Sequence, residues 1–338
     1  MVKKIIAAVI VTTVIAFAVT GVLGLWIVKC EKFLETTEVT LELDLPKNGT
    51  FNQFYDRVFT YLNTPPYFRE YLIHVKKADR RIKYGYYRAE NMLLRDYLEN
   101  IFKGTQSTLK ITIPEGYNIH DIASVLEKAN IISAEDFLKT ALDDEFIFRL
   151  TGIPAPTIEG FLYPDTYFFP PYTKADYVIR TMYANFLNNL PYDFAERAEE
   201  KGLTFYQALI LASIVQKETY IDEEAKTVAS VFYNRLKKRM RLQADPTIIY
   251  GKYAEFDGNI RKEDIRDGEN PYNTYVIRGL PPTPISNPDR QSLEAAAYPA
   301  ETDYLFFVAR QDRTHVFTKT YDEHRRQVYL HQIKRGQK

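Results

Sequence analysis

The strongest pattern of apolar positions lies at the N-terminus. Residues Ile5–Val28 contain no charged side chain and are bounded by Lys3, Lys4 and Lys29. At about 1.5 Å per residue, a helix of this length crosses a hydrocarbon layer of about 30 Å. A cleaved signal peptide usually has a shorter apolar region followed promptly by a small-residue cleavage site, which is missing here. The pattern therefore predicts a cytoplasmic tail at 1–4 and a retained transmembrane helix at 5–28.

The charges around this span bear on its orientation. Lys3, Lys4 and the α-amino group precede the span, whereas Lys29 and Lys32 follow it with two glutamates nearby. This distribution slightly favours a cytoplasmic N-terminus by the positive-inside rule, and Trp26 stands where an interfacial aromatic residue is expected. We therefore expect a single-pass protein of the cell (inner) membrane whose body is extracytoplasmic.

Two segments beyond the span repeat one pattern. Alternation over Val39–Gly49 is followed by helical spacing over Phe51–Leu62, and alternation over Leu109–Gly116 by helical spacing over Ile119–Leu126. Alternation is typical of half-buried strands, and i, i+3, i+4 spacing is typical of amphipathic helices. The pattern predicts a small strand–helix module used twice within a region at 38–150. Such modules bind ligands or simply pack, and the spacing does not decide between these.

A second region begins near Pro154, where two prolines prevent a helix from continuing. A helix is predicted from about Ala175 to Leu187. Another is predicted to start at Thr204, because Gln207 three residues later completes a capping-box pattern. We expect this region, 154–338, to form a separate domain.

The helix that starts at Thr204 ends in a glutamate, Glu218. Leu211, Ile214 and Val215 precede Glu218 by seven, four and three positions, which are same-face spacings on an α-helix. A carboxyl among apolar neighbours has a raised pKa and can serve as a proton donor near neutral pH. A glutamate near a helix end is more often solvated or ion-paired, so the spacing alone does not identify an enzyme.

Composition narrows the function classes. Lys plus Arg and Asp plus Glu are 44 each, so no net charge attracts nucleic acid. The 26 Tyr and 21 Phe suit either sugar contacts or ordinary packing. The single cysteine, Cys30, excludes an internal disulfide framework and a Cys-rich metal site. With neither a paired-His motif nor a Gly-rich phosphate loop, we expect no metal and no organic cofactor.

The segment Leu211–Thr219, LASIVQKET, is similar to the signature of the MltG family of endolytic murein transglycosylases. Other blocks match the family in chain order and together cover nearly the whole chain: 159–167, 228–236, 240–251, 270–288, 292–300, 304–308 and 315–318. The resemblance implies an α+β fold with a single N-terminal transmembrane helix, a LysM-like α/β module and a lysozyme-like catalytic domain.

Site residues follow from the resemblance position by position. The family's catalytic glutamate directly precedes a threonine, and Glu218-Thr219 fits that place. Many members have a second glutamate two residues earlier, where this chain has Gln216. No second carboxyl at that position therefore competes with Glu218 for the catalytic role. The matching blocks suggest as substrate-binding residues Tyr163, Asp165, Tyr167, Gln243, Asp245, Asn273 and Tyr275. Turn formation or strand packing explains each of these equally well.

The resemblance implies cleavage of peptidoglycan strands at MurNAc–GlcNAc bonds with one carboxyl, because the muramoyl C6 hydroxyl attacks in place of water and leaves a 1,6-anhydro end. Glu218 acts first as general acid and then as general base. Peptidoglycan synthases (penicillin-binding proteins) are expected partners, and growing strands would be terminated.

Three alternatives remain. They are a hydrolytic muramidase, which needs a second carboxylate such as Asp165 or Asp245, a non-catalytic peptidoglycan-binding scaffold, and a pyridoxal-phosphate lyase, for which no phosphate cup is found.

Overall fold

The computed structural model describes residues 1–47, 49–219 and 221–333, and the chain divides into two compact units, Met1–Leu109 and Lys110–Lys338. This division differs from the boundary near residues 150–154 that the sequence suggested. The reason is a two-stranded sheet that spans the expected boundary, in which β3 (Leu109–Thr112) pairs with β4 (Thr166–Phe169). The proline-rich turn at 154 therefore lies inside the second unit.

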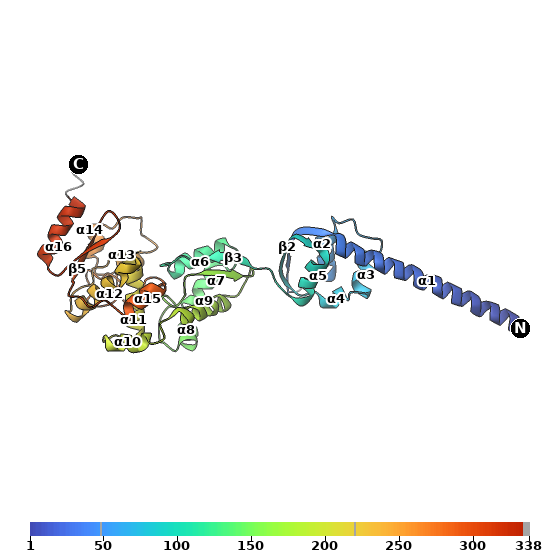
Figure 1. The fold of residues 1–338 in the computed structure, drawn as a ribbon, viewed down its shortest axis with the longest axis horizontal. Coiled ribbons are helices and arrows are strands. Elements are labelled where there is room, and N and C mark those ends of the chain that lie inside the picture. Colours follow the sequence, from blue (N-terminus) through green and yellow to red (C-terminus); the bar gives the residue numbers. More distant parts are fainter. Residues whose placement is uncertain (48, 220, 334–338) are drawn as a thin grey trace. The chain divides into compact units, whose positions relative to one another are not determined.

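Unit 1 (Met1–Leu109) starts with one long helix and continues as a small α/β body (Figure 1). Its elements are α1 (Val2–Thr36), β1 (Glu38–Leu45), α2 (Phe51–Phe59), α3 (Phe68–His74), α4 (Ala78–Arg81), β2 (Gly85–Leu93) and α5 (Leu94–Lys103). Strands β1 and β2 are antiparallel, with register from Glu38 opposite Leu93 to Leu45 opposite Gly85. The strand and helix predicted from residue 39 are confirmed as β1 and α2.

Helix α1 has two parts. Its side chains are exposed as far as Leu25, and from Trp26 onward one face of the helix packs against the body of unit 1, with Cys30 and Leu34 fully buried in its core. By length and composition α1 is apolar enough to cross a membrane, as the sequence predicts, and it alone meets this criterion among the described residues.

Unit 2 (Lys110–Lys338) is mostly helical, with short two-stranded sheets. After β3, its elements are α6 (Ile119–Lys128), α7 (Ala134–Ala141), α8 (Asp144–Thr151), β4, α9 (Ala175–Asn189), α10 (Phe194–Glu200), α11 (Phe205–Glu218), α12 (Asp222–Lys237), α13 (Asp245–Gly251), α14 (Lys262–Arg266), α15 (Arg290–Ala297), β5 (Phe306–Ala309), β6 (His315–Thr318), α16 (Tyr321–Val328) and a π-helical turn, Tyr329–Ile333. Strands β5 and β6 are antiparallel. The helices predicted near 119, 175 and 204 are confirmed as α6, α9 and α11.

Helix α11 is the centre of unit 2. Every residue from Ala208 to Gln216 is buried, and α10, α12, α13 and α15 surround it. A helix that is apolar on all sides must be buried on all sides, which is why α11 forms the axis of this unit. The strand–helix echo is confirmed locally but not as a repeated pairing, because β1 pairs with β2 and β3 with β4.

Candidate active site

Glu218 is the last residue of α11, and the sequence accounts for both ends of this helix. At the start, Thr204 Oγ1 accepts a hydrogen bond from Gln207 N, and Gln207 Oε1 accepts one from Thr204 N, which completes the predicted capping box. At the end, Thr219 adopts extended backbone, with its hydroxyl accepting from Ile221 N at 3.0 Å. Glu218 therefore lies where a buried helix reaches the surface.

The last turns of α11 are fixed by polar contacts to the segment that leads into α15. Gln216 Oε1 accepts from Asp289 N at 2.7 Å and from Ser292 Oγ at 3.0 Å. One turn earlier, Ser213 Oγ accepts from Ile285 N at 3.0 Å. Because both contacts of Gln216 are accepted by its oxygen, a glutamate could make them equally well. In this chain Gln216 thus holds α11 and α15 together.

The carboxyl of Glu218 is half-buried and unsupported. Within residues 1–47, 49–219 and 221–333, no group donates a hydrogen bond to it. The pKa of Glu218 is raised to about 8, mainly by burial and also by the negative charge of Asp245, while the positive charge of Arg235 acts against the rise. The negative end of the α11 dipole also disfavours a carboxylate. Glu218 is therefore mostly protonated at neutral pH and free to donate its proton.

Asp245 and Tyr275 form the nearest polar pair. The Tyr275 hydroxyl donates to Asp245 Oδ1 at 2.6 Å. Burial raises the pKa of Tyr275, as do the hydrogen bond to Asp245 and the charges of Asp245 and Glu218. These mutual effects place the three predicted residues Glu218, Asp245 and Tyr275 in one electrostatic neighbourhood.

Gln243 lies in the loop before α13, close in sequence to Asp245. Its backbone N–H donates to Thr274 O at 3.1 Å, and Ala244 N donates to Thr274 Oγ1 at 2.9 Å. The side chain of Gln243 is exposed, and its backbone is left-handed at φ 51°. The loop before α13 is thereby joined to the segment that carries Tyr275.

Arg235, on α12, is a residue that the sequence analysis did not single out. Its side chain is only 7% exposed. The guanidinium donates to Leu305 O and Leu242 O, each at 2.6 Å, and lies 5.3 Å from the ring centroid of Phe306. It holds the loop before α13 in place and adds a positive charge near Glu218. Its place within the matching block 228–236 was the only signal in the sequence.

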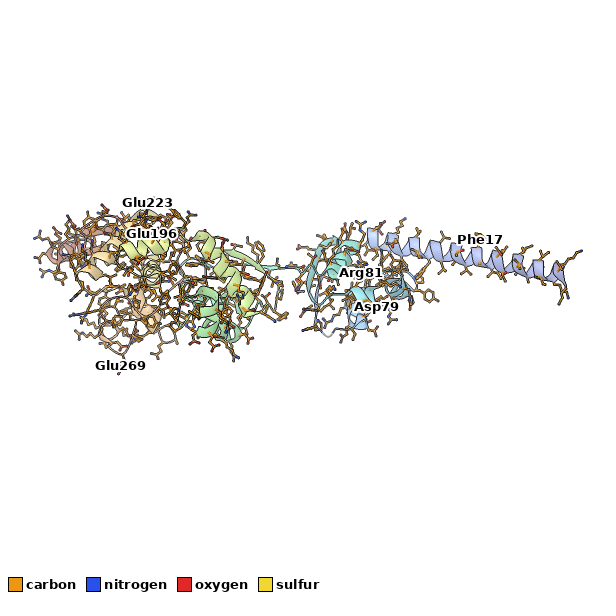
Figure 2. The ribbon with its side chains drawn as sticks, turned by 90° about the horizontal axis from the view of Figure 1, so that it is seen from below. Phe17, Asp79, Arg81, Glu196, Glu223 and Glu269 are labelled. Carbon is orange, nitrogen blue, oxygen red and sulfur yellow. The ribbon has the colours of Figure 1, made fainter. Side chains whose placement is uncertain are left out.

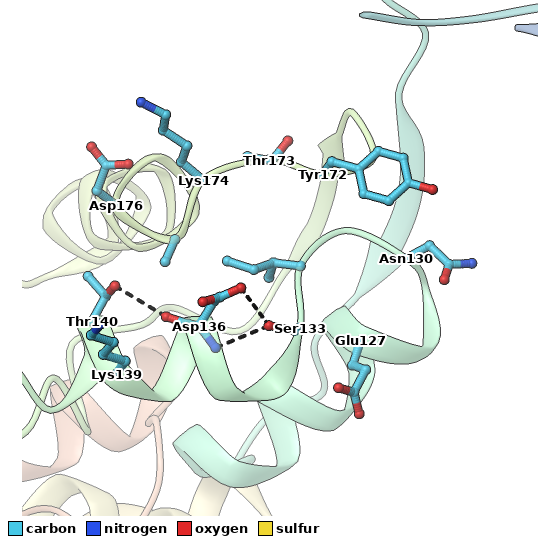
Figure 3. A pocket seen from close by; sticks show the side chains of 12 residues that line it. Glu127, Asn130, Ser133, Asp136, Lys139, Thr140, Tyr172, Thr173, Lys174 and Asp176 are labelled. Atoms are coloured by element: carbon cyan, nitrogen blue, oxygen red, sulfur yellow. Dashed lines mark hydrogen bonds between the residues drawn. The ribbon is translucent and has the colours of Figure 1, made fainter. Parts of the chain in front are cut away.

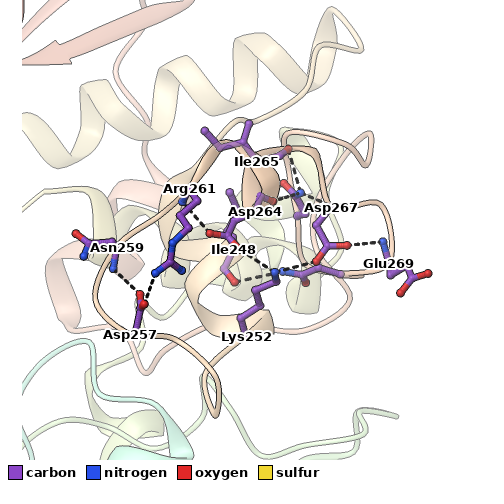
Figure 4. A network of polar contacts seen from close by, with 11 residues as sticks. Ile248, Lys252, Asp257, Asn259, Arg261, Asp264, Ile265, Asp267 and Glu269 are labelled. Carbon is purple, nitrogen blue, oxygen red and sulfur yellow. Dashed lines mark hydrogen bonds and ion pairs between the residues drawn. The ribbon is translucent and has the colours of Figure 1, made fainter.

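The side chain of Asn273 is enclosed by the protein and is not open to solvent. Its side chain is fully buried, and Nδ2 donates to the carbonyls of Asp264, Ile265 and Asp267. Figure 4 shows the polar network at this point, where Lys252 pairs with Asp264 at 2.8 Å and with Asp267 at 3.1 Å. Because its amide is used to order this loop, we do not retain Asn273 as a sugar contact.

The predicted group Tyr163, Asp165 and Tyr167 forms a cluster of its own. The Tyr167 hydroxyl donates to Tyr163 O at 2.6 Å, and Asn185 Nδ2 donates both to Asp165 Oδ2 at 2.9 Å and to the Tyr167 hydroxyl at 3.1 Å. Tyr167 is buried, whereas Tyr163 is half-buried and Asp165 exposed. No hydrogen bond between described residues joins this cluster to Glu218, Asp245 or Tyr275.

Glu159 is a second buried carboxyl, which the sequence analysis recorded only as part of a matching block. It accepts from Asn287 Nδ2 at 2.7 Å, Ile119 N at 2.9 Å and the Tyr250 hydroxyl at 3.1 Å. Burial raises the pKa of Glu159 to about 8, although the hydrogen bonds from Ile119 N and the Tyr250 hydroxyl act against the rise. Asn287 Oδ1 in turn accepts from Gly160 N and Leu162 N, both at 2.9 Å. Four distant segments meet at this pair.

An open cavity of about 780 Å³ lies elsewhere in unit 2, between the α6–α7 connection and the start of α9 (Figure 3). Lys139 and Lys174 line it together with Asp136 and Asp176, so its charges are mixed. It contains none of the predicted site residues. The cavity is therefore separate from the candidate site around Glu218.

Comparison with known proteins identifies the family of the chain. The model of the YceG-like family matches residues 44–329. A Bacillus subtilis protein named endolytic murein transglycosylase is 31% identical over 270 residues, which are 75% of this chain and 74% of that protein. A Streptococcus pneumoniae serotype 2 protein of the same name is 31% identical over 281 residues, 74% of this chain but only 51% of the relative.

A solved structure is similar as well. The crystal structure of a YceG-like protein from Listeria monocytogenes has a TM-score of 0.58 and 29% identity, covering 86% of this chain and all of the other. These findings confirm the resemblance drawn from the motifs around Glu218. The chain belongs to the YceG-like family.

Proposed function

We propose that this protein is a membrane-anchored endolytic murein transglycosylase that cleaves MurNAc–GlcNAc bonds within peptidoglycan strands and leaves 1,6-anhydro-MurNAc ends. The names of the curated relatives support this activity. The observation that carries the proposal is the setting of Glu218, a half-buried carboxyl at the end of α11 whose pKa burial raises and to which no described residue donates a hydrogen bond.

Glu218 supplies both proton transfers. It donates its proton to the bridging glycosidic oxygen as the bond to the muramoyl C1 breaks. The C6 hydroxyl of the same sugar then attacks C1, and the Glu218 carboxylate accepts the hydroxyl proton, which restores the acid. Arg235 stabilises the intermediate carboxylate, whereas the charge of Asp245 favours return of the proton. Since the nucleophile belongs to the substrate, one carboxyl is sufficient.

The glycan contacts nearest to Glu218 are Gln243, Asp245 and Tyr275, on two loops that hydrogen bonds join. Tyr163 and Asp165 are partly accessible and are the candidates for a sugar farther along the strand, whereas Tyr167 positions them. We assign the catalytic part of unit 2 to a lysozyme-like core, and the two strand–helix segments within 38–150, one in each unit, to LysM-like glycan-binding elements.

The anchor sets the place of the reaction. Helix α1 is long and apolar enough to cross a membrane once. With its N-terminus in the cytoplasm, both units lie in the compartment that contains peptidoglycan. There the enzyme would terminate growing strands beside peptidoglycan synthases (penicillin-binding proteins).

A hydrolytic muramidase is the second candidate, and one observation favours it. Asp245 is close enough to Glu218 to affect its pKa and is itself exposed. An acid and a second carboxylate are the usual equipment of a glycoside hydrolase.

The experiment that decides between them is digestion of purified glycan in ¹⁸O-water followed by mass spectrometry of the fragments. Unlabelled anhydro ends from the middle of long strands are expected. Reducible, ¹⁸O-labelled ends as the main product would replace the transglycosylase by the muramidase, and intact strands would leave only a binding scaffold.

A further inference from the structure

The place where α1 joins the body of unit 1 coincides with the place where an apolar span would leave a membrane. From Ile5 to Leu25 the helix is exposed and uncharged, and at about 1.5 Å per residue this length matches a hydrocarbon layer of about 30 Å. The next residue, Trp26, already packs against the core of unit 1. No linker therefore separates the span from the folded body.

Residues 65–77, here called the interfacial segment, contact α1 at this level. The Trp26 indole Nε1 donates to Pro66 O at 3.0 Å, and the rings of Trp26 and Tyr71 meet edge to face with centroids 6.1 Å apart. Slightly farther along α1, Glu31 pairs with Lys76 at 2.9 Å. Figure 1 shows α3, the helix of this segment, beside α1. The segment thus lies at the height where lipid headgroups begin.

Two residues that precede helices in this part of unit 1 have an unusual backbone. Tyr67, before α3, has φ 56°, and Lys77, before α4, has φ 58°. Glycine and asparagine are the residues that adopt this left-handed conformation at low cost, whereas a tyrosine or a lysine does so with strain. Both side chains point to solvent, and Tyr67 is 76% exposed. Packing within the protein therefore does not explain why a tyrosine and a lysine occupy these two positions.

Tyrosine and lysine are the side chains that favour the boundary between hydrocarbon and water. An aromatic ring with a hydroxyl suits the headgroup level, and lysine extends its ammonium toward lipid phosphates. Lys29 and Lys32, exposed on α1 just beyond Trp26, add positive charge at the same level. An anionic lipid surface matches this combination.

We propose that the interfacial segment rests in the headgroup layer of the membrane that α1 spans, with Tyr67 inserted at the lipid boundary and Lys77 against anionic headgroups. The body of unit 1 is then held against the bilayer surface, instead of being connected to it only through a flexible linker. This inference rests on α1 being a membrane anchor, as proposed above.

The test uses the full-length protein in lipid nanodiscs of phosphatidylcholine and phosphatidylglycerol. Tyr67→Cys, Phe17→Cys and Glu90→Cys are each labelled with an environment-sensitive fluorophore. Phe17 is on the free part of α1 (Figure 2), and Glu90 is on β2, at the other end of unit 1 in Figure 1. The unsubstituted protein controls for labelling of Cys30, which is buried. Quenching is measured with nitroxide-bearing lipids and with aqueous iodide.

Lipid quenching at position 67 is expected to be several-fold stronger than at position 90, with iodide quenching in the reverse order. Substituting Lys77→Gln in the labelled Tyr67→Cys protein should weaken lipid quenching at position 67 when phosphatidylglycerol is present. Equal quenching at 67 and 90, with Phe17 still quenched by lipid, would overturn the docking while leaving the anchor intact. Loss of lipid quenching at Phe17 would overturn the anchor and the docking together.

Discussion

Two carboxyls in unit 2 share a raised pKa of about 8 with burial as its main cause, yet their surroundings differ completely. Glu159 accepts hydrogen bonds from Ile119 N, the Tyr250 hydroxyl and Asn287 Nδ2. Glu218 accepts none from the described residues. Glu159 lies where four segments cross, whereas Glu218 lies at the exposed end of one helix.

The difference shows that a perturbed pKa does not by itself identify a catalyst. Structural networks also perturb pKa values, and the contacts of Glu159 explain its burial without any reaction. Glu218, in contrast, accepts no hydrogen bond from the described residues, so the fold does not explain its raised pKa or its position. Replacing glutamate by glutamine should therefore reduce turnover but not stability at position 218, and stability more than turnover at position 159.

The largest effect is expected for Glu218→Gln. The amide keeps the shape of the side chain but cannot donate the proton, so turnover should fall at least about a hundredfold. Release of fragments from purified glycan strands measures this loss. The melting temperature should stay the same or rise, because no described hydrogen bond is lost. Retained turnover in a folded variant would remove Glu218 from the mechanism.

Glu159→Gln should act on stability. Glutamine offers one acceptor oxygen in place of two, and its amide N–H₂ would face another donor in this network. Leaving a buried polar group unpaired costs about 1–3 kcal/mol, so the melting temperature should fall by several degrees. Turnover per folded molecule should change far less than in Glu218→Gln. A fully stable Glu159→Gln variant with the activity loss of Glu218→Gln would reverse the two roles.

The pH dependence of the reaction sharpens the contrast. A general acid must be protonated, so kcat/KM should decline as the pH rises through about 8, the pKa of Glu218. Asp245→Asn removes a charge that raises this pKa, and the basic limb should therefore move to lower pH. Asp165→Asn is the matched control, because Asp165 belongs to the separate cluster with Asn185. An unmoved limb in Asp245→Asn would show that another group limits the rate.

The smallest effect concerns stability against pH. The folded-state pKa of Glu218 is above its usual value of 4.5, so the unfolded chain binds fewer protons between pH 4.5 and 8, and stability falls over that window. Glu218→Gln removes this dependence. Its melting temperature relative to the unsubstituted protein should therefore rise steadily from pH 5 to pH 8. A difference that does not vary with pH would mean that the Glu218 pKa is close to normal.

The local elements were predictable because local signals specify them. The capping box at Thr204 and the spacing of Leu211, Ile214 and Val215 gave α11 with Glu218 at its end. The unit boundary was not predictable, because β3 and β4 pair across more than fifty positions and are only four residues long. Such short strands carry too little alternation to reveal their partner.

Only part of the candidate site was predictable from the sequence. Asp245 and Tyr275 came from separate blocks and meet through one hydrogen bond, while Asn273, two residues before Tyr275, is turned inward to three carbonyls. Neighbouring polar residues in a loop point in different directions, and only the path of the backbone decides which are accessible. Arg235 and Glu159 were missed because a buried charged residue resembles a surface one in sequence.

The division of the chain at Leu109 has a consequence for what a protease could release. The backbone passes from unit 1 to unit 2 once, so one proteolytic cut at that crossing would separate the candidate active site from helix α1. The residues named around Glu218 all lie in unit 2 and would leave with the released fragment. Strand β4 and the part of β3 after Leu109 would leave with them. A single crossing of the backbone therefore joins the part of the chain that carries Glu218 to the apolar helix α1.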